Sequence, residues 1–189
     1  MPKRRQPSAD FIFWGRLHKQ KDIPRALKLF SGVCKSCPDS RLLIIGPDGG
    51  ELNEVIAVTE RLKIKNNLCL RSGMKREDIF AEAQRASFFL QTSKEEGMSM
   101  AVVEAMQLGL VPVVTNVGEI SNYCRHGDNS IIVQKEQDTD SIDSILRLLN
   151  DPAKFSQMSY AAAEEWQSKA TYREDVLSAC QDIVERGAS

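Results

Sequence analysis

The sequence predicts a doubly wound α/β fold, a Rossmann-like parallel sheet of about six strands with extra helices at its C-terminal end. Two observations predict it. Short apolar runs typical of buried strands alternate with longer segments whose apolar residues recur at steps of three and four. Turn residues separate the runs, as at Gly46-Pro47 and Gly97. Right-handed crossovers between parallel strands, with helices on both faces, follow from this alternation.

The strand-like runs are six in number by this pattern. They cover residues 11–15, 41–46, 68–70, 88–91, 111–114 and 130–133. Helical patterns follow the first five runs. They cover residues 22–36, 51–62, 75–86, 99–108 and 119–124. Ligands of open parallel sheets bind outside the carboxyl ends of the strands, so functional side chains are expected in the turns that follow the strands.

Three more helices are expected after the sheet. They are 139–149, with apolar residues on one face; 152–168, opened by Asp151-Pro152; and 172–185, opened by the capping box Thr171-x-x-Glu174. Residues 1–10 are basic and contain two prolines, which is typical of a linker or boundary segment. A membrane-surface role for Lys3, Arg4 and Arg5 is the alternative. The folded domain is therefore expected to cover residues 11–189.

Bulk composition excludes several classes of function. The net charge of −1 gives no basic field of the kind that attracts nucleic acid. No apolar run approaches the roughly 20 residues that span a bilayer, and the first residues lack the apolar segment of a signal peptide. A hydrophobic content of 42% with 27% charged residues is that of an ordinary globular domain. These features predict a cytoplasmic protein.

The five cysteines do not form a metal-binding pattern. Cys34 and Cys37 are two residues apart, but no second pair and no nearby histidine completes a zinc site. Both continue the apolar stripe of the helix expected at 22–36, which predicts buried thiols in a reducing compartment. No Asp-x-Asp element accompanies the candidate site described below, so neither a metal nor a cofactor is expected.

The most informative feature is the segment Glu96-Gly-Met-Ser-Met-Ala-Val-Val-Glu104. Gly97 separates a strand from a helix, so backbone N–H groups from Gly97 to Met100 would point out of the helix start, where an anion such as phosphate is favoured. Carboxylates accept hydroxyl donors, and the diol of a sugar supplies two. Phosphate and sugar together indicate a nucleotide sugar.

Two cations lie at the end of the first strand. Gly15-Arg16 closes the strand, and Lys21 follows just before a helix. Arginine offers a bidentate fork and lysine a mobile point charge, so the two side chains can hold a pyrophosphate and neutralise the charge that builds on it. A solvated basic turn is the alternative, because Lys19 and Arg25 are basic as well.

Taken together, these motifs resemble the C-terminal, donor-binding domain of the retaining GT-B glycosyltransferases of family 4. The resemblance extends from residue 11 to about residue 185. It rests on Glu96-x7-Glu104 with Ala-Met and Gly-Leu-Val-Pro-Val-Val, on residues 13–21, on Leu43-Ile-Ile-Gly46, on Arg71-Ser-Gly73 and on Val117-Gly-Glu-Ile120. Such enzymes have two Rossmann-like lobes, so the resemblance implies that this chain lacks the N-terminal acceptor-binding lobe and is inactive alone.

The resemblance also implies roles for individual residues. Arg16, Lys21 and Glu96 would be catalytic, the two cations on the diphosphate and Glu96 on the transferred sugar, while Glu104 would bind the ribose. The remaining donor-binding positions are Gly15 at the end of the first strand, the backbone of Gly97, Met98, Ser99 and Met100, and, in the turn expected at the base, Gly73 and Met74. Six residues at four places depart from the family pattern. Met98-Ser99 replace an aromatic residue and glycine, Asp22 and Ser130 each replace a glycine, and Ser121-Asn122 replace Pro-Glu.

The predicted function is transfer of a hexose or N-acetylhexosamine from a nucleoside-diphosphate sugar, UDP favoured, to a hydroxyl acceptor. By resemblance, the acceptor would be a lipid-linked glycan of bacterial surface polysaccharide, O-antigen or capsule, which would place the complete enzyme at the inner face of the cytoplasmic membrane. The alternatives are a GT-B epimerase, a glycogen-synthase-like polymerase, and a non-catalytic nucleotide-sugar-binding module or partner subunit. A receiver-type signalling domain is rejected, because Gly15-Arg16 stands where its acidic pocket would be.

Overall fold

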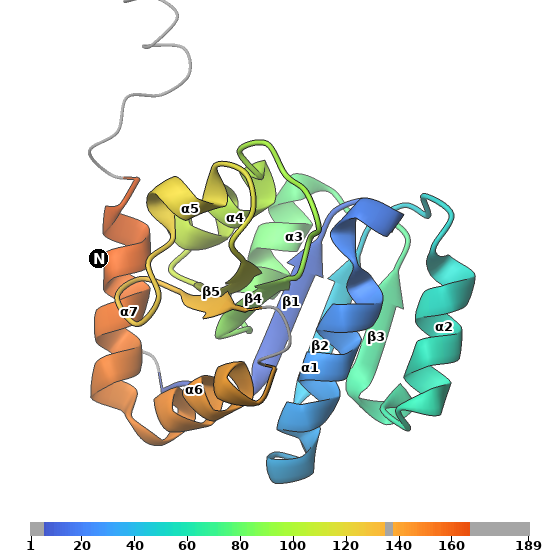
Figure 1. Ribbon diagram of the computed structural model, residues 1–189, viewed down its shortest axis with the longest axis horizontal. Helices are drawn as coiled ribbons and strands as arrows, with labels where there is room; N and C mark the ends of the chain where they lie inside the picture. The colour runs from blue at the N-terminus through green and yellow to red at the C-terminus, as the bar shows by residue number, and fades with distance from the viewer. Residues whose placement is uncertain (1–5, 135–137, 167–189) are drawn as a thin grey trace, which may run out of the picture.

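A single parallel sheet organises the protein, whose computed structural model describes residues 6–134 and 138–166 (Figure 1). The strand order is β3-β2-β1-β4-β5-β6, and all five strand pairs are parallel. The strands are β1 (Asp10–Trp14), β2 (Arg41–Ile45), β3 (Leu68–Arg71), β4 (Phe88–Gln91), β5 (Val111–Thr115) and β6 (Ile131–Val133). The predicted doubly wound fold and its six strands are confirmed.

Helices cover both faces of the sheet. They are α1 (Ile23–Ser36), α2 (Leu52–Arg61), α3 (Arg76–Ala83), α4 (Met100–Gln107), α5 (Ile120–Tyr123), α6 (Asp138–Asn150) and α7 (Pro152–Glu164). Helix α1 packs between α2 and α6, whereas α7 packs on α4 and β5. Figure 1 shows α1 and α2 in front of the sheet and α3 behind it. None of the helices within the described ranges has the length and apolar character that crossing a bilayer requires.

The N-terminal end of the domain differs from the sequence prediction. Strand β1 begins at Asp10, and the Ser8 N–H donates to the Ser87 hydroxyl at 2.8 Å, so packed structure starts before residue 11. The seven described helices also begin or end within a few residues of their expected bounds, as helix boundaries commonly do. The helix expected at 172–185 lies outside the described residues.

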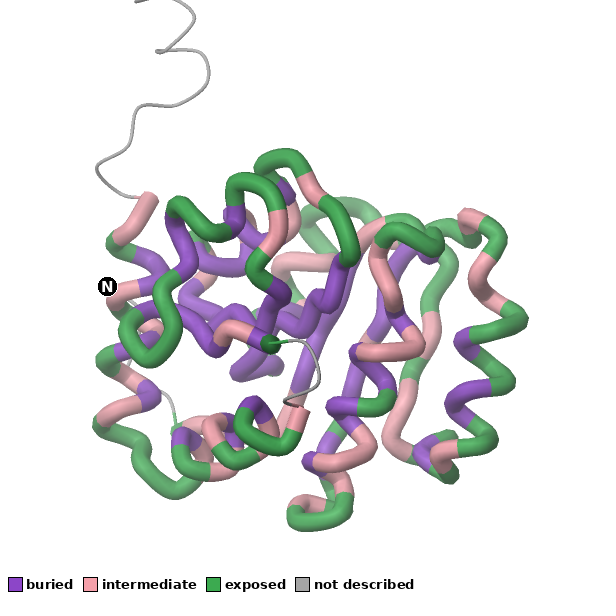
Figure 2. The backbone as a smooth tube through the Cα atoms, viewed as in Figure 1, coloured by how far each residue is buried: buried purple, intermediate pink, exposed green. Residues whose placement is uncertain are grey.

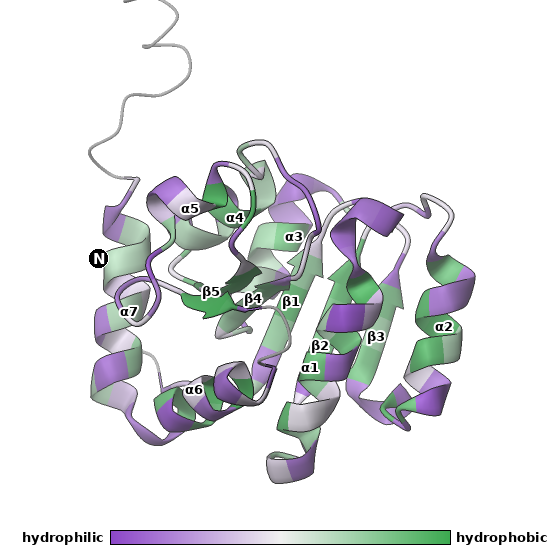
Figure 3. Cartoon of the chain, in the orientation of Figure 1, coloured by the Kyte–Doolittle hydropathy of each residue, from purple (hydrophilic) through white to green (hydrophobic). Residues whose placement is uncertain are grey.

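Aromatic rings from neighbouring strands form the centre of the core. Phe11 stacks on Phe88 with ring centroids 5.0 Å apart, and Trp14 packs edge-on against Phe89 at 4.6 Å. Every residue of β4 and β5 is buried. Figure 2 shows this buried band running through the middle of the molecule, and Figure 3 shows the strands as its most hydrophobic part. Trp14 is thus the packing residue that the sequence predicts.

The cysteines occupy different environments. Cys34 and Cys37 are partly buried and pack against the core, so the expected burial is incomplete. Burial raises the pKa of the Cys34 thiol to about 11, which keeps it protonated and unreactive near neutral pH. Cys124 is buried, Cys69 is exposed, and Cys180 lies outside the described residues.

Asp48 caps the helix that follows β2. One oxygen of its carboxylate, Oδ1, accepts hydrogen bonds from the N–H groups of Gly50, Glu51 and Leu52 at 2.8, 3.0 and 3.1 Å. These bonds, that from Gly50 first, lower the pKa of Asp48 below its ordinary value. The start of α2 is therefore already occupied by a negative group of the protein itself.

Replacing Asp48 with asparagine is expected to reduce the acid dependence of stability. Because the folded pKa lies below the unfolded value, the carboxylate stabilises the fold above about pH 4 and loses this contribution as the pH falls through the folded pKa. Urea unfolding at pH 7 and pH 3 measures the effect. The wild-type protein should be the more stable at pH 7, and the difference should be smaller at pH 3. A difference that is equal at both pH values would contradict this account.

Candidate functional site

The loops after β1, β4 and β5 form one hydrogen-bonded unit at the carboxyl edge of the sheet. The Lys94 N–H donates to the Gln20 carbonyl at 2.8 Å, and the Gln20 side-chain amide donates to the Glu95 carbonyl at 3.0 Å. On the other side, the Thr115 hydroxyl donates to the Ser93 carbonyl at 2.6 Å. The loop that carries Glu96 is therefore held from both sides before any ligand binds.

Gly118 allows this loop to approach the segment after β5. Its φ is +55°, and a Cβ atom at this position would lie 1.9 Å from the carbonyl oxygen of Glu96. The Glu119 N–H donates to the Gly97 carbonyl at 3.1 Å, and the Tyr123 hydroxyl donates to the Met98 carbonyl. Only glycine fits both this backbone conformation and this close approach.

The Glu96 carboxylate is a focus of hydrogen bonds. Its Oε1 accepts from Lys21 Nζ at 2.5 Å, from the Ser93 hydroxyl at 2.6 Å and from the Gln91 amide at 3.1 Å. The exposed fraction of the side chain is 7% for Glu96 and 20% for Lys21. No described residue donates to the second oxygen, Oε2. The structure thus unites two predicted residues, but as an ion pair and not with Lys21 standing free for a phosphate.

Gln91 and Ser99 complete the network behind Glu96. The Gln91 amide nitrogen also donates to the Ser99 hydroxyl at 2.8 Å, and its buried oxygen has no hydrogen-bond partner among the described residues. Ser99 has a φ of +52° and Asp22 a φ of +46°. Both positions are departures from the family pattern at which glycine is usual, and both adopt the left-handed conformation that glycine favours. The hydrogen bond from Gln91 compensates for part of this cost at Ser99.

The start of α4 presents unused backbone donors. None of the described residues accepts a hydrogen bond from the N–H groups of residues 97–101. The start of α2 differs, because Asp48 occupies its donors. Met98 and Met100 flank the α4 start with side chains that are 45% and 58% exposed. The predicted anion-binding feature is therefore available at α4.

Glu104 is paired at both carboxylate oxygens. Oε2 accepts from the Trp14 indole N–H at 3.0 Å, and Oε1 forms an ion pair with Arg76 Nη2 at 2.8 Å. The carboxylate that the resemblance assigns to the ribose is therefore already paired, because the protein supplies both partners itself. A ligand hydroxyl would have to replace one of them.

Arg16 stands apart from the other predicted residues. It is exposed, and it forms no hydrogen bond or ion pair with any described residue. Its aliphatic stem lies against Gly49, where a Cβ atom would come within 2.9 Å of it. The backbone beside it is fixed, since the Gly15 N–H donates to the Ile45 carbonyl and the Leu17 N–H to the Pro47 carbonyl, each at 2.9 Å. The guanidinium is therefore free to bind an anion.

The predicted base-binding turn follows β3. Gly73 is exposed, and a Cβ atom added to it would meet nothing within 4 Å, whereas Met74 is partly buried. Arg71 bonds to Glu82 Oε1 at 3.1 Å and contacts the Met74 sulfur at 3.5 Å. The space around Gly73 is therefore open to solvent.

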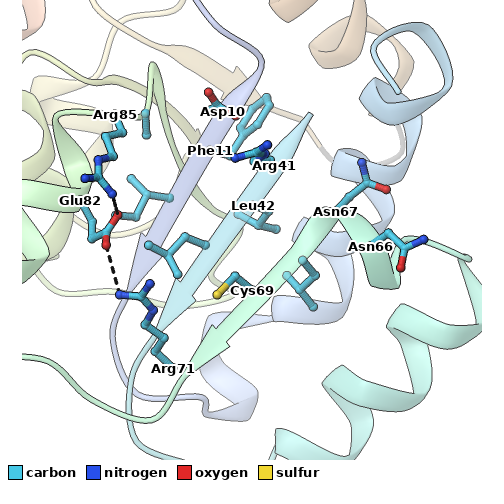
Figure 4. Close-up of a pocket in the computed structure, with 14 residues that line it drawn as sticks. Asp10, Phe11, Arg41, Leu42, Asn66, Asn67, Cys69, Arg71, Glu82 and Arg85 are labelled. Carbon is cyan, nitrogen blue, oxygen red and sulfur yellow. Dashed lines mark hydrogen bonds and ion pairs between the residues drawn. The ribbon is translucent and has the colours of Figure 1, made fainter. Parts of the chain in front are cut away.

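Two hollows lie near these residues. A hollow of about 650 Å³ at the carboxyl ends of β4 to β6 is lined by Ser93, Thr115 and Asn116 but not by Arg16, Lys21 or Glu96. A groove of about 320 Å³ runs along β1 to β3 from Asp10 to Arg71, as Figure 4 shows, and no predicted site residue lines it. Within the described ranges, His, Cys, Asp and Glu side chains form no group of three that could hold a metal ion.

Sequence reasoning missed the residues that hold the two carboxylates. Gln91 and Ser93 support Glu96, and Trp14 supports Glu104. A signal for Gln91 was present, because an amide ends the otherwise apolar strand Phe88–Leu90, and a buried amide requires partners. No comparable signal identifies Trp14, whose role depends on a contact across 90 positions of the sequence.

Known proteins resemble this chain in sequence and in fold. A family model described as "Glycosyl transferases group 1" matches residues 2–165. GDP-mannose:cellobiosyl-diphosphopolyprenol alpha-mannosyltransferase of Xanthomonas campestris is 26% identical over 172 residues, which are 86% of this chain and 45% of that protein. Poly(glycerol-phosphate) alpha-glucosyltransferase of Bacillus subtilis is 28% identical over 179 residues, 92% of this chain and 26% of that protein. The chain thus spans less than half the length of these relatives.

Solved structures share the fold. TarM of S. aureus, solved in complex with Fondaparinux, alpha-GlcNAc-glycerol and UDP, superposes with a TM-score of 0.84 at 19% identity, over 96% of this chain and 36% of that one. The C-terminal domain of a glycosyl transferase group 1 family protein (LpcC) from Francisella tularensis superposes with a TM-score of 0.74 at 16% identity, over 88% of each chain.

Proposed function

Because this chain belongs to the glycosyl transferases group 1 family and has the fold of a GT-B glycosyltransferase lobe, we propose that it forms the donor-binding half of a retaining enzyme. The enzyme would transfer a hexose or N-acetylhexosamine from a nucleoside-diphosphate sugar to a hydroxyl acceptor. The observation that carries the proposal is the start of α4, where backbone donors without acceptors lie beside the Lys21–Glu96 pair.

The diphosphate would bind at the start of α4. The free N–H groups of residues 97–101 and the positive end of the helix dipole favour an anion there. Arg16, free of internal partners, would approach the diphosphate from the loop after β1. Lys21 would neutralise charge on the leaving group while it remains bonded to Glu96. Arg16 and Lys21 would then stabilise the charge that develops as the glycosidic bond breaks.

The transferred sugar would bind to Glu96. Oε1 is committed to three donors of the protein, so the carboxylate is fixed in orientation, and Oε2 has no donor among the described residues. Oε2 can therefore accept a sugar hydroxyl without breaking an internal bond. Met98 and Ser99 stand beside this position, and they would shape the pocket for the sugar differently from the family's usual aromatic residue and glycine.

The acceptor and the nucleotide are proposed from the resemblance and from a similar protein of known activity. We favour UDP, and a lipid-linked glycan of bacterial surface polysaccharide as acceptor, which would bring the complete enzyme to the inner face of the cytoplasmic membrane. The similarity to a mannosyltransferase that acts on cellobiosyl-diphosphopolyprenol supports the acceptor, although that relative uses GDP-mannose. Because the chain spans less than half of the length of its relatives, we expect that it does not transfer sugar alone. Because no Asp-x-Asp element accompanies the site, we also expect no requirement for a metal ion or cofactor.

Calorimetric titration tests the proposal. The chain is titrated with UDP-glucose, UDP-N-acetylglucosamine and GDP-mannose, and with UDP and GDP alone. We expect saturable binding of one nucleotide, tightened by its matching sugar and unaffected by EDTA. Failure of all five compounds to bind would overturn the proposal. Measurable transfer of radiolabelled sugar by this chain alone would contradict its assignment as half of an enzyme.

Replacing Glu96 with glutamine is expected to weaken the contribution of the sugar. Glutamine can still accept at Oε1 but carries an amide nitrogen in place of Oε2, so the sugar hydroxyl loses a charged acceptor. This loss should weaken the affinity for the nucleotide sugar about tenfold. Calorimetry should show this loss for the nucleotide sugar and little change for the free nucleotide. Glu95→Gln, a change of the exposed neighbour, is the matched control. Equal losses for nucleotide and nucleotide sugar would refute this role.

A further inference from the structure

The two partners of the Glu104 carboxylate differ in how firmly they are held. Trp14, which donates to Oε2, is 6% exposed, whereas the Arg76 side chain that pairs with Oε1 is 65% exposed. An exposed ion pair contributes little to stability because solvent competes for both charges. A hydrogen bond from a buried indole persists, since a buried N–H that loses its acceptor carries the full cost of desolvation.

The elements that carry the two partners differ in the same way. Trp14 ends the central strand β1, and its ring packs edge-on against the fully buried Phe89, with 4.6 Å between centroids. Arg76 begins α3, a helix in which Ala83 is the only buried residue. Its guanidinium also lies 5.1 Å from the centre of the Phe80 ring, an alternative contact on the same helix. Arg76 can therefore leave Glu104, whereas Trp14 cannot.

We propose that Trp14 is a positioning residue for recognition of the ribose of the nucleotide. Its indole N–H holds Oε2 and so fixes the plane of the Glu104 carboxylate at the end of the sheet. Oε1, once Arg76 withdraws, accepts a ribose hydroxyl. This inference rests on the proposed function, and it assigns different roles to the two partners: a permanent support and a group that the ligand displaces.

The expected signature is selectivity for the ribose hydroxyls. Dissociation constants are measured for UDP and for 2′,3′-dideoxy-UDP, or for the guanosine pair if GDP binds better. In the wild-type protein, loss of the hydroxyls should weaken binding about tenfold, the value of a hydrogen bond to a charged acceptor. Trp14→Phe keeps the aromatic packing but removes the N–H, and it should reduce this ratio to about two- to threefold.

Two further variants separate positioning from general stability. Trp166→Phe removes the other indole of the chain, which donates to the Met106 sulfur at 3.4 Å, and it should leave the ratio unchanged. Arg76→Gln removes the displaceable partner, so the ratio should stay the same or increase. A ratio that falls in Trp14→Phe but does not fall in Arg76→Gln would not arise from a purely structural role of Trp14.

The indole N–H also reports directly by nuclear magnetic resonance. With two tryptophans, the indole region contains two signals, which the two tryptophan variants assign. Glu104→Gln should move the Trp14 signal in the free protein, and UDP should move it while leaving the Trp166 signal in place.

The outcomes separate the two proposals. Binding of UDP with a strong preference for the ribose hydroxyls that survives Trp14→Phe overturns the role of Trp14 and leaves the proposed function standing. If the wild-type protein binds UDP and 2′,3′-dideoxy-UDP equally well, the role of Trp14 is also overturned and the proposed function stands. Absence of binding by UDP and GDP overturns the proposed function, and the ribose inference with it.

Discussion

Replacing Arg16 with alanine is expected to lower the turnover of the proposed two-lobed enzyme by about 10²-fold or more, as removal of one preorganised donor typically does. The guanidinium is the predicted site cation that has no internal partner among the described residues, so its charge is available to the leaving diphosphate. Lys21, in contrast, shares its charge with Glu96. Steady-state measurement of kcat with a saturating donor tests the expectation.

Two controls make this result specific. Because Arg16 is exposed and makes no internal ion pair, its replacement should change the free energy of unfolding by less than about 0.5 kcal/mol, which thermal denaturation can verify. Lys19→Ala removes a second exposed cation from the same loop and should leave kcat within about twofold, since an exposed charge away from the reacting groups is largely screened. Near-normal turnover of Arg16→Ala would remove Arg16 from the catalytic residues.

Replacing Gly118 with alanine is expected to destabilise the fold by roughly 3 kcal/mol, from the left-handed backbone conformation and from forced overpacking. The added Cβ would stand 1.9 Å from the Glu96 carbonyl oxygen and 2.9 Å from that of Gly97, so the loop that carries Glu96 has to move. Such a loss should lower Tm by roughly 6–12 °C for a chain of this length. The gain in affinity that the sugar gives to the nucleotide should also decrease, because Glu96 would leave its position beside Lys21.

Gly127 provides the matched control. It also has a positive φ, of +78°, but nothing lies within 4 Å of a Cβ atom there. Gly127→Ala should therefore show only the conformational cost, about 1–2 kcal/mol, and should leave binding intact. Equal effects of the two substitutions on stability and on binding would mean that the close approach at Gly118 does not position Glu96.

The fold follows from the sequence because its signals are local. Apolar runs of three to six residues and helical stripes identify the strands and helices, and the structure confirms their order. The ends of the domain are less accessible to such reasoning. Ser8 and Asp10 belong to the folded part through contacts with Ser87 and Arg41, and a polar segment does not reveal contacts with residues so distant in sequence.

The candidate site was predictable in its residue types but not in its pairings. The Glu-x7-Glu spacing and the two cations indicate an anion and a sugar. The sequence does not show that Lys21 bonds to Glu96, or that Trp14 and Arg76 already occupy Glu104. Likewise, Asp22 and Ser99 read only as departures from the family pattern, whereas the structure shows that both retain the left-handed backbone typical of glycine. Side-chain pairing across loops depends on tertiary geometry, which spacing alone does not fix.

The candidate site has two parts that differ in how firmly they are held, because α3 makes few buried contacts with the rest of the domain. The loops after β1, β4 and β5 are cross-linked to one another, whereas α3 contributes one buried residue and an exposed arginine. Under the proposed function, changes to α3 and to the turn before it should therefore alter which base is accepted and leave binding of the diphosphate intact. A designer who wishes to exchange one nucleotide for another would begin with residues 72–84 and leave the remainder of the domain as it is.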